Sequence, residues 1–309
     1  MKALTFVFGT TLAFFSTAGG AFAFQDSGTP GVPVSVTITA EPGRGKVVPT
    51  LTKGDVAVYQ GKDKRPVMDV TPQNQSLQLL LLISDSARSS FDTEISTLKQ
   101  FINSLPASTE IGIGYMRNGT NQMVANFTRD HAAAANSIRL VSGPGGADVS
   151  PYDSLFDAIK NWPKTPAERR EVIMVSSGIE DLGGGFTSDN PYVEHAISDA
   201  QKAGVIVYTI YTPGVGHLGH SYWRSTWGQN FLSQLSDETG GESYMIGFGS
   251  PVSFQPFLQQ IVDNLKHQYR LTFEAKPEKK AGLQAIRVQS VEKNATIAAP
   301  DRVFVKAGT

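Results

Sequence analysis

The residues of this chain that could hold a charged or polar ligand are concentrated in one short segment, residues 84–90. It supplies a carboxyl group, a guanidinium group and several hydroxyl groups, from Ser84, Asp85, Ser86, Arg88 and Ser89. The apolar run Leu79–Ile83 directly precedes it, and an apolar run that ends abruptly in polar residues indicates a buried strand followed by a loop. Apolar residues then recur at helical spacing over residues 91–105. A strand, a polar loop and a helix in this order begin a doubly wound sheet, whose ligands bind at the carboxyl ends of the strands.

The connection of residues 212–227 is a second candidate binding segment. It leaves the carboxyl end of the predicted strand 205–211, so we expect it over the same edge of the sheet. Its histidine and aromatic side chains are His217, His220, Tyr222, Trp223 and Trp227. Aromatic residues are enriched in binding hot spots, although these three could instead fold down and cover the sheet edge. The two histidines have no third ligand nearby, so the sequence does not predict a zinc site.

The elements that must position these segments alternate between strand and helix from residue 76 to residue 268. This alternation predicts an α/β fold with a doubly wound, mainly parallel, Rossmann-like sheet. Residues 34–75 and 269–309 instead contain strand patterns, and we expect these strands to pair in a small β-sandwich. The predicted organisation is a signal peptide (1–23), a linker (24–33), an N-terminal β module (34–75), the α/β domain (76–268) and C-terminal strands (269–309).

The first 23 residues have the pattern of a secretory signal peptide. One charge, Lys2, precedes an apolar stretch, and small residues end in Ala21-Phe22-Ala23. The apolar stretch is shorter than the roughly 20 residues of a membrane span, and no later stretch qualifies. We therefore expect an exported protein, periplasmic or extracellular, without a transmembrane segment.

Composition excludes several classes of function. Removal of Lys2 with the signal peptide reduces the 27 basic residues to 26, against 28 acidic ones, which gives a charge of −2. A chain near neutrality gives no electrostatic reason to expect nucleic-acid binding. The chain has no cysteine, so thiol catalysis and disulfides are excluded, and an exported chain of this length must rely on its apolar core.

The order of elements and three motifs resemble the von Willebrand factor A (VWA) domain, and in particular the bacterial VWFA-related exported proteins. The motifs are the loop 84–90, the helix that follows Ser150-Pro151, and the segment 237–242 before a final strand. The resemblance covers roughly residues 34–305. It implies the VWA fold and a face at the carboxyl edge of the sheet that binds a protein.

The resemblance also implies a metal site, and this chain departs from it. The family holds Mg²⁺ or Mn²⁺ with Asp-x-Ser-x-Ser on a first loop, a Thr on a second and an Asp on a third. Here the first motif retains one ligand if it starts at Ser84 and two if it starts at Asp85. The second loop offers Val149 or Ser150 in place of the Thr. In the third loop, Ser177 stands where the family has Asp. Hard dications need carboxylate charge, so we expect no bound metal and no other cofactor. If a metal were bound, Asp85, Ser89 and Ser150 would be its ligands.

Arg88 suggests one alternative for this site. Its guanidinium could occupy the place of the metal and meet a carboxylate of the partner, because its fork matches carboxylate geometry. It could also form an ordinary surface ion pair with Asp85 or Asp92.

The sequence thus predicts a non-enzymatic protein-interaction module with a degenerate metal-ion-dependent adhesion site. The predicted ligand-binding face consists of Ser84, Asp85, Ser86, Arg88, Ser89, Ser177, Asp181, His217, His220, Tyr222 and Trp223. No Gly-x-Ser-x-Gly elbow or phosphate-binding glycine loop is present. Two alternatives are kept: a hydrolase that uses Asp85, Asp153 and Asp181 as acid and base, and a structural envelope component that binds through the β-sandwich. The sequence leaves the partner and the oligomeric state open.

Overall fold

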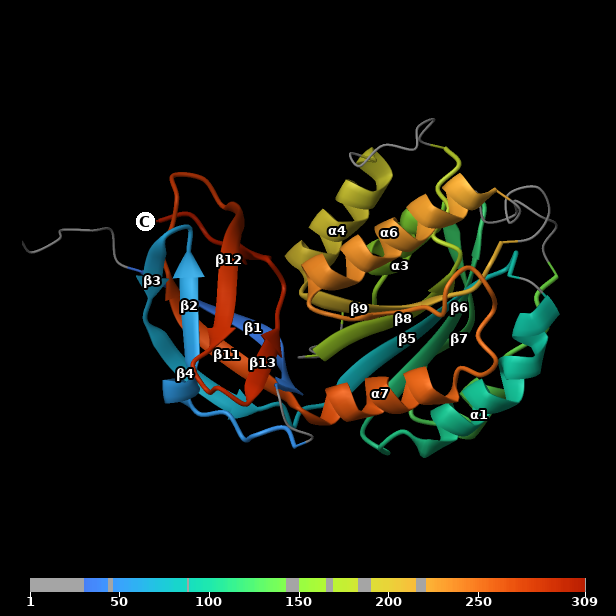
Figure 1. Cartoon of the computed structure of the whole chain (residues 1–309), viewed down its shortest axis with the longest axis horizontal. Helices are drawn as coiled ribbons and strands as arrows, with labels where there is room; N and C mark the ends of the chain where they lie inside the picture. The colour runs from blue at the N-terminus through green and yellow to red at the C-terminus, as the bar shows by residue number, and fades with distance from the viewer. Residues whose placement is uncertain are drawn as a thin grey trace, which may run out of the picture.

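A computed structural model describes residues 31–43, 47–87, 89–142, 150–164, 169–182, 190–214 and 221–308. An α/β unit and a β-sandwich lie side by side (Figure 1). The predicted signal peptide lies outside the described residues. No helix among the residues described is long and apolar enough to cross a membrane.

The α/β unit is built on a six-stranded sheet in the order β10-β9-β8-β5-β6-β7. Its strands are β5 (Leu77–Ser84), β6 (Glu110–Arg117), β7 (Thr120–Thr128), β8 (Arg169–Ser176), β9 (Val205–Tyr211) and β10 (Ser243–Tyr244). All neighbours are parallel except the edge pair β6–β7. Every residue of β5 is buried, as expected for the centre of a sheet that is covered on both faces.

Helices cover both faces of this sheet (Figure 1). Leu79, Leu81 and Ile83 of β5 pack towards α1 (Ile95–Ser104), α2 (His131–Asn136) and α7 (Gln255–Lys266). Leu80 and Leu82 pack towards α3 (Pro151–Lys160), α4 (Pro191–Ala203) and α6 (Tyr222–Thr239). A 3₁₀ helix, η2 (Ser89–Glu94), precedes α1. The predicted doubly wound fold is thereby confirmed.

One predicted helix was too short. The pattern indicated a helix over residues 231–238 and a loop through Trp227, but α6 begins at Tyr222 because Ser221 caps it. The Ser221 hydroxyl accepts a hydrogen bond from the backbone N–H of Arg224, which satisfies a free donor of the first turn. The aromatic residues of this stretch therefore stand on a helix, not on a loop.

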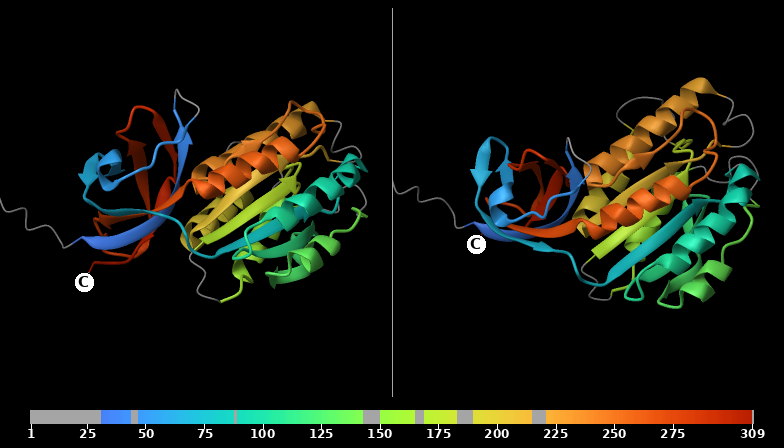
Figure 2. Two further views of the ribbon diagram at one scale, coloured as in Figure 1. Left: turned by 90° about the horizontal axis from the view of Figure 1, so that it is seen from below. Right: turned by 60° about the horizontal axis from the view of Figure 1, so that its bottom comes forward.

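The β-sandwich interleaves strands from the two ends of the chain (Figure 2). One sheet has the order β13-β1-β11-β4 and the other β14-β12-β2-β3. The strands are β1 (Val32–Pro42), β2 (Val56–Gln60), β3 (Asp63–Arg65), β4 (Val67–Pro72), β11 (Gln268–Ala275), β12 (Gly282–Ser290), β13 (Ala295–Ala298) and β14 (Arg302–Val305). The predicted pairing of N- and C-terminal strands is confirmed, whereas β13 and the 3₁₀ helix η1 (Lys53–Asp55) were not foreseen. Ile38, Val58 and Phe273 lie in the core between the sheets.

A buried polar network joins the two units. Arg169, at the start of β8, forms an ion pair of 3.4 Å with Glu171 and donates to the carbonyl oxygens of Gln73 and Leu265. Gln268 of β11 donates to the hydroxyl of Tyr208 on β9. Burial raises the pKa of Glu171 despite the nearby guanidinium. Because such groups are costly to bury unpaired, this network favours one arrangement of the sandwich against the sheet.

Candidate functional site at the carboxyl edge of the sheet

Ser84 and Ser86, in the first loop, contact each other. Ser84 is the last residue of β5, and its Oγ lies 3.2 Å from the Oγ of Ser86. The Ser84 Oγ also accepts a hydrogen bond from the backbone N–H of Ser86. Both side chains are buried. In the register that begins at Ser84, the neutral Ser84 stands where the family has a carboxylate. This pair alone therefore gives a dication no charge to bind.

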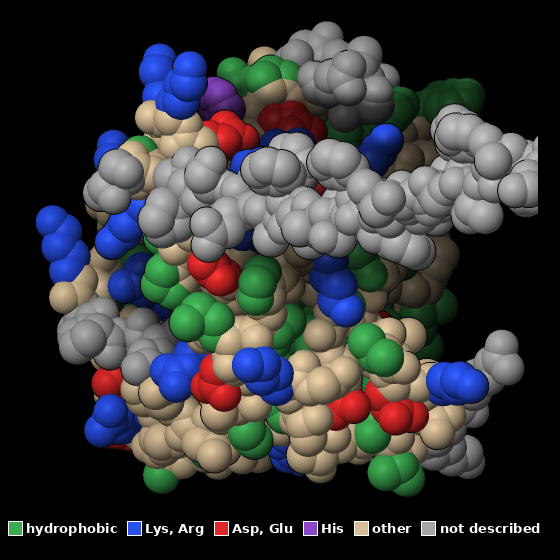
Figure 3. All heavy atoms as spheres, turned by 90° about the vertical axis from the view of Figure 1, so that its left-hand side faces the viewer, with side chains coloured by type: hydrophobic (Ala, Val, Ile, Leu, Met, Phe, Trp, Pro, Cys, Tyr) green, Lys and Arg blue, Asp and Glu red, His purple; other side chains and the backbone are tan. Residues whose placement is uncertain are grey.

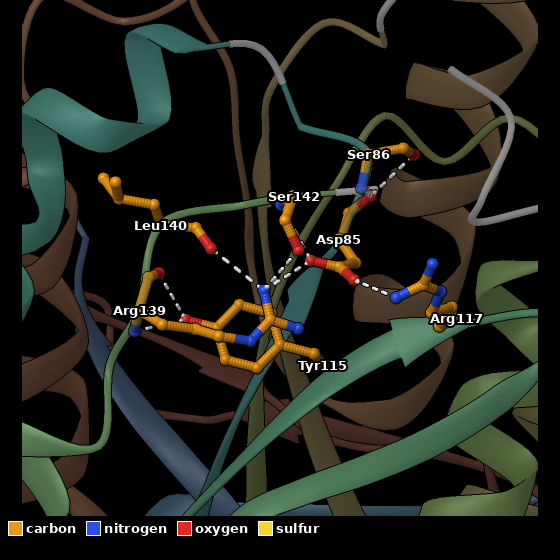
Figure 4. Close-up of polar contacts among 8 residues, drawn as sticks. Asp85, Ser86, Tyr115, Arg117, Arg139, Leu140 and Ser142 are labelled. Carbon is orange, nitrogen blue, oxygen red and sulfur yellow. Dashed lines mark hydrogen bonds and ion pairs between the residues drawn. The ribbon is translucent and has the colours of Figure 1, made fainter. Parts of the chain in front are cut away.

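Asp85 is fully buried and is held by two arginines (Figure 4). Arg139 Nη1 lies 2.7 Å from Oδ1, and Arg117 Nη1 lies 3.5 Å from Oδ2. The backbone N–H of Ser142 donates a third hydrogen bond to Oδ1, at 3.2 Å. The carboxylate is thus already neutralised and hydrogen-bonded by the chain itself, as a buried charge requires.

Tyr115 fixes the position of Arg139. The Arg139 guanidinium carbon lies 4.0 Å from the centre of the Tyr115 ring, a cation–π contact. The Tyr115 hydroxyl donates a hydrogen bond to the backbone carbonyl oxygen of Arg139 and accepts one from the backbone N–H of Arg139. The hydrogen bond with Asp85 raises the pKa of Arg139. Arg139 therefore remains charged beside Asp85 at any pH at which the protein is folded.

A buried serine–glutamate pair joins the second loop to the third loop, residues 176–181. Ser150 caps α3 by accepting a hydrogen bond from the N–H of Asp153, and its hydroxyl donates to Glu180 Oε2 at 2.6 Å. The other oxygen of Glu180 accepts from the N–H of Leu182. Burial raises the pKa of Glu180 to about 7. Ser150 is fully engaged in this arrangement, which leaves its hydroxyl oxygen poorly placed to bind a metal.

The third loop, residues 176–181, is packed against α6. Arg224 Nη1 lies 2.5 Å from Asp181 Oδ1. Gly178, with a φ of 66°, lies directly against the carbonyl oxygen of Gly228 on α6. The Ser177 hydroxyl accepts a hydrogen bond from the N–H of Ile179. These contacts fix the third loop to the start of α6, so the two segments form one continuous surface.

The aromatic residues at the start of α6 separate into two groups. Trp227 is half-buried and packs on Phe231, with ring centres 5.6 Å apart. Tyr222 and Trp223 are 62% and 71% exposed, and the Tyr222 ring lies 4.9 Å from that of Phe248. Only Trp227, of the three aromatic residues considered above, folds down towards the sheet. The other two form an exposed aromatic patch, defined here as Tyr222, Trp223 and Phe248.

Some residues of the predicted face are not among those that the structure describes. Arg88, His217 and His220 lie outside the described residues, as does the side chain of Ser89. The remaining members of the predicted face lie on the loops that follow β5 and β8 and on the first turn of α6. An isolated bridge between Ala87 and Gly214 connects the first loop to the segment after β9.

The three carboxylates of the hydrolase alternative have different neighbours. Asp85 contacts Arg117 and Arg139, Asp181 contacts Arg224, and Asp153 faces the turn at Gly119. In the part of the chain that is described, no group of three acidic or histidine residues could hold a metal ion. The described contacts thus tie Asp85 and Asp181 to arginines.

Sequence reasoning missed three residues of this site. Arg117 ends β6, so its position at the carboxyl edge was open to inference from the strand pattern. Glu180 is four residues beyond β8 and was overlooked beside Asp181. Arg139 follows the short helix α2, and no signal in the sequence connects it to Asp85, 54 residues earlier.

The sheet order, the antiparallel edge strand and the helices on both faces define a VWA-like α/β fold with an added β-sandwich. The sequence matches no family model and no curated protein. Among solved structures, BatB from Bacteroides thetaiotaomicron is similar over 61% of this chain and 98% of its own, with 13% identity and a TM-score of 0.44. The SpRpn10 VWA domain covers 60% of this chain and 94% of its own, with 13% identity and a TM-score of 0.41.

A third similar structure extends over both units. The three N-terminal domains of the type V pili tip protein Mfa5 from Porphyromonas gingivalis cover 91% of this chain and 67% of their own, with 11% identity and a TM-score of 0.43. At such identities the likenesses concern the fold alone. Function has to be argued from the residues of the site.

Proposed function

We propose that this chain is an exported, non-enzymatic protein-interaction module in which built-in arginines replace the metal of an adhesion site. The observation that carries the proposal is the buried Asp85 carboxylate, held at the carboxyl edge of the sheet by Arg139 and Arg117. The same region of the molecule carries the exposed aromatic patch at the start of α6.

The partner would present an acidic side chain to this face. Arg139 and Arg117 are partly exposed, and each guanidinium has five N–H donors, more than Asp85 can accept. A carboxylate of the partner would therefore bind a guanidinium that Asp85 holds in place. In the VWA family the corresponding carboxylate binds the metal ion. Tyr222 and Trp223 would supply apolar contact area beside it, in the manner of interface hot spots.

Two features favour binding over catalysis. The Ser150 hydroxyl and Glu180 are both buried, so a substrate cannot reach them in this conformation. The partly exposed carboxylate of the third loop, Asp181, forms an ion pair with Arg224. These contacts support the binding proposal over the hydrolase alternative.

Binding by the mature protein to its isolated partner, measured with EDTA and with Mg²⁺, tests this proposal. We expect equal affinity in the two conditions, a loss of about tenfold or more for Trp223→Ala, and no change for Met68→Ala. Met68 is exposed on β4 of the sandwich and serves as the control. A requirement for Mg²⁺ would contradict the proposal, and a loss confined to Met68→Ala would favour the structural envelope component.

Export is tested separately by mass spectrometry of the N-terminus of the protein from its native host. Cleavage after Ala23 gives a mature chain that begins at Phe24. An intact Met1 in the purified protein would contradict export through a cleaved signal peptide.

A further inference from the structure

A hollow of about 520 Å³ lies between the sandwich and the α/β unit, at the end of the sheet opposite to the site above. Its walls come from β1 and β14 on the sandwich, and from the end of α4 and the start of β9 on the other unit. The volume falls within the range of small-molecule sites. This hollow, called the junction groove here, is separate from the binding face proposed above.

The charges that line the junction groove all have one sign. Its described lining includes four basic residues and no carboxylate: Arg170, Lys202, Arg270 and Arg302. On the outer end of the sandwich, by contrast, basic and acidic side chains are intermixed (Figure 3). A cavity with one sign of charge and protein walls concentrates ions of the opposite sign.

Two of these arginines make few hydrogen bonds or ion pairs within the described part of the chain. The Nε of Arg170 is buried and has no hydrogen-bond partner among the described residues. Arg302 forms no ion pair within 4 Å in the described part of the chain. Asp301 and Glu238 are close enough to interact with its charge at longer range. Asp301 is itself engaged, because its Oδ1 accepts a hydrogen bond from Gln201. A buried guanidinium nitrogen without a partner is costly, and an anionic ligand would satisfy it.

The groove also has an apolar wall. Val34 and Val36 of β1, together with Pro300 and Phe304, line it, and the Phe304 side chain is 44% exposed. A ligand that is only an inorganic ion would leave this wall in contact with water. The combination of guanidinium groups and apolar side chains suits an organic ligand with separate anionic and apolar parts.

We propose that the junction groove binds a small organic polyanion. Its anionic groups would be held by Arg170, Arg270 and Arg302, and its apolar part would lie against Val34 and Phe304. Arg170 belongs to β8 of the α/β unit, whereas Arg270 and Arg302 belong to strands of the sandwich. A bound ligand would therefore contact both units and stabilise their present arrangement.

Calorimetric titration of the full mature protein at constant ionic strength tests the anionic half of the proposal, with citrate and tripolyphosphate as probes of the arginine side chains and acetate as the monovalent comparison. We expect saturable binding of one citrate or one tripolyphosphate per chain, and a rise in melting temperature with that probe. Binding of citrate alone identifies carboxylates as the preferred groups, and binding of tripolyphosphate alone identifies phosphates. Saturable binding of neither probe overturns the proposal.

Variants locate the binding in the groove. Arg302→Gln and Arg170→Gln should each weaken binding about tenfold, the loss expected for a hydrogen bond to a charged group. Lys62→Gln, an exposed residue of the β2–β3 turn, removes the same charge elsewhere on the sandwich and should change nothing. Equal weakening by Lys62→Gln indicates non-specific attraction and overturns the site. Trp223→Ala should leave polyanion binding intact, so a failure of the proposed protein interaction is distinguishable from a failure here.

Discussion

Arg139 places its Nη1 2.7 Å from Oδ1 of Asp85, a carboxylate with no exposed surface. In a metal-dependent adhesion site the positive charge comes from solvent and is lost to a chelator. Here the chain carries the charge itself, and Tyr115 holds the guanidinium in position. The charge that balances the Asp85 carboxylate is therefore supplied by the fold itself.

Removal of Arg139 should destabilise the protein. Arg139→Gln leaves the buried Asp85 carboxylate with Arg117 at 3.5 Å and the Ser142 N–H. The loss of one partner of a fully buried ion pair costs about 3–5 kcal/mol. Because Arg139 is partly exposed, we expect a smaller cost of about 2–3 kcal/mol here. Urea unfolding at pH 7 measures the change in free energy.

Arg129→Gln is the matched control for this experiment. Arg129 pairs with Glu110 at 3.4 Å on the surface, and both side chains are accessible to water. The expected cost is below about 1 kcal/mol. If the two variants lost equal stability, the Arg139–Asp85 pair would be no more than an ordinary surface contact.

Metal addition should have no effect on the folded protein. Asp85 is occupied by arginines, and Ser84, Ser86 and Ser177 offer neutral hydroxyl groups. After treatment with a chelator, titration with Mg²⁺ or Mn²⁺ is therefore expected to give no saturable heat below millimolar concentration and no change in melting temperature. Submillimolar binding abolished by Asp85→Asn would restore the metal-dependent interpretation.

The architecture could be predicted because it follows from patterns of burial that the sequence carries directly. The run Leu79–Ile83 is apolar throughout because both faces of β5 are covered. Ser150-Pro151 and Asn190-Pro191 begin α3 and α4 as their capping chemistry predicts. The start of α6 was missed because its apolar pattern is weak before Phe231, while the cap at Ser221 is one serine among many.

The site was predictable only in part, because its decisive contacts join distant segments. The apolar run of β5 and the polar loop after it placed Asp85 at the carboxyl edge. The identity of its partner depends on where the chain runs after α2, and nothing local to Arg139 encodes this position. A pair with Asp85 or with Asp92 was one of the alternatives left open for Arg88, which lies outside the described residues. Among the described residues, Arg117 and Arg139 hold Asp85.

Stability should fall as the pH rises through the range in which Glu180 ionises. Burial raises its pKa in the folded state to about 7, above the 4.5 of the unfolded chain. The folded state therefore binds the proton more tightly, and the stabilisation is complete below about pH 4.5 and lost by the time the pH passes 7. We expect a contribution of up to about 2 kcal/mol between pH 5 and 8.

Glu180→Gln should remove this part of the pH dependence. Other carboxyls with raised pKa values, such as Glu41 and Asp237, keep their own contributions. The measurement is therefore the difference in unfolding free energy between pH 5 and pH 8, compared among wild type, Glu180→Gln and the exposed control Glu278→Gln. A difference that is unchanged in Glu180→Gln but reduced in Glu278→Gln would contradict the assignment.

Gly178 and Gly204 offer a matched test of how closely the third loop is packed on α6. Both have a positive φ, 66° and 65°, so alanine incurs similar backbone strain at the two positions, of about 1 kcal/mol. A Cβ at Gly204 would meet open space, whereas one at Gly178 would overlap the backbone of Gly228 and the side chain of Leu232. Gly178→Ala must therefore displace the loop or the helix.

We expect Gly204→Ala to cost about 1 kcal/mol and Gly178→Ala at least about 3 kcal/mol, because overpacking adds to the strain. Gly178→Ala should also weaken binding of the partner, since the shift disturbs the Asp181–Arg224 pair beside Trp223. Urea unfolding measures the stabilities, and partner affinity is measured on the folded fraction. Equal costs for the two variants would mean that the third loop yields freely, and the rigid surface inferred for this edge of the sheet would then be wrong.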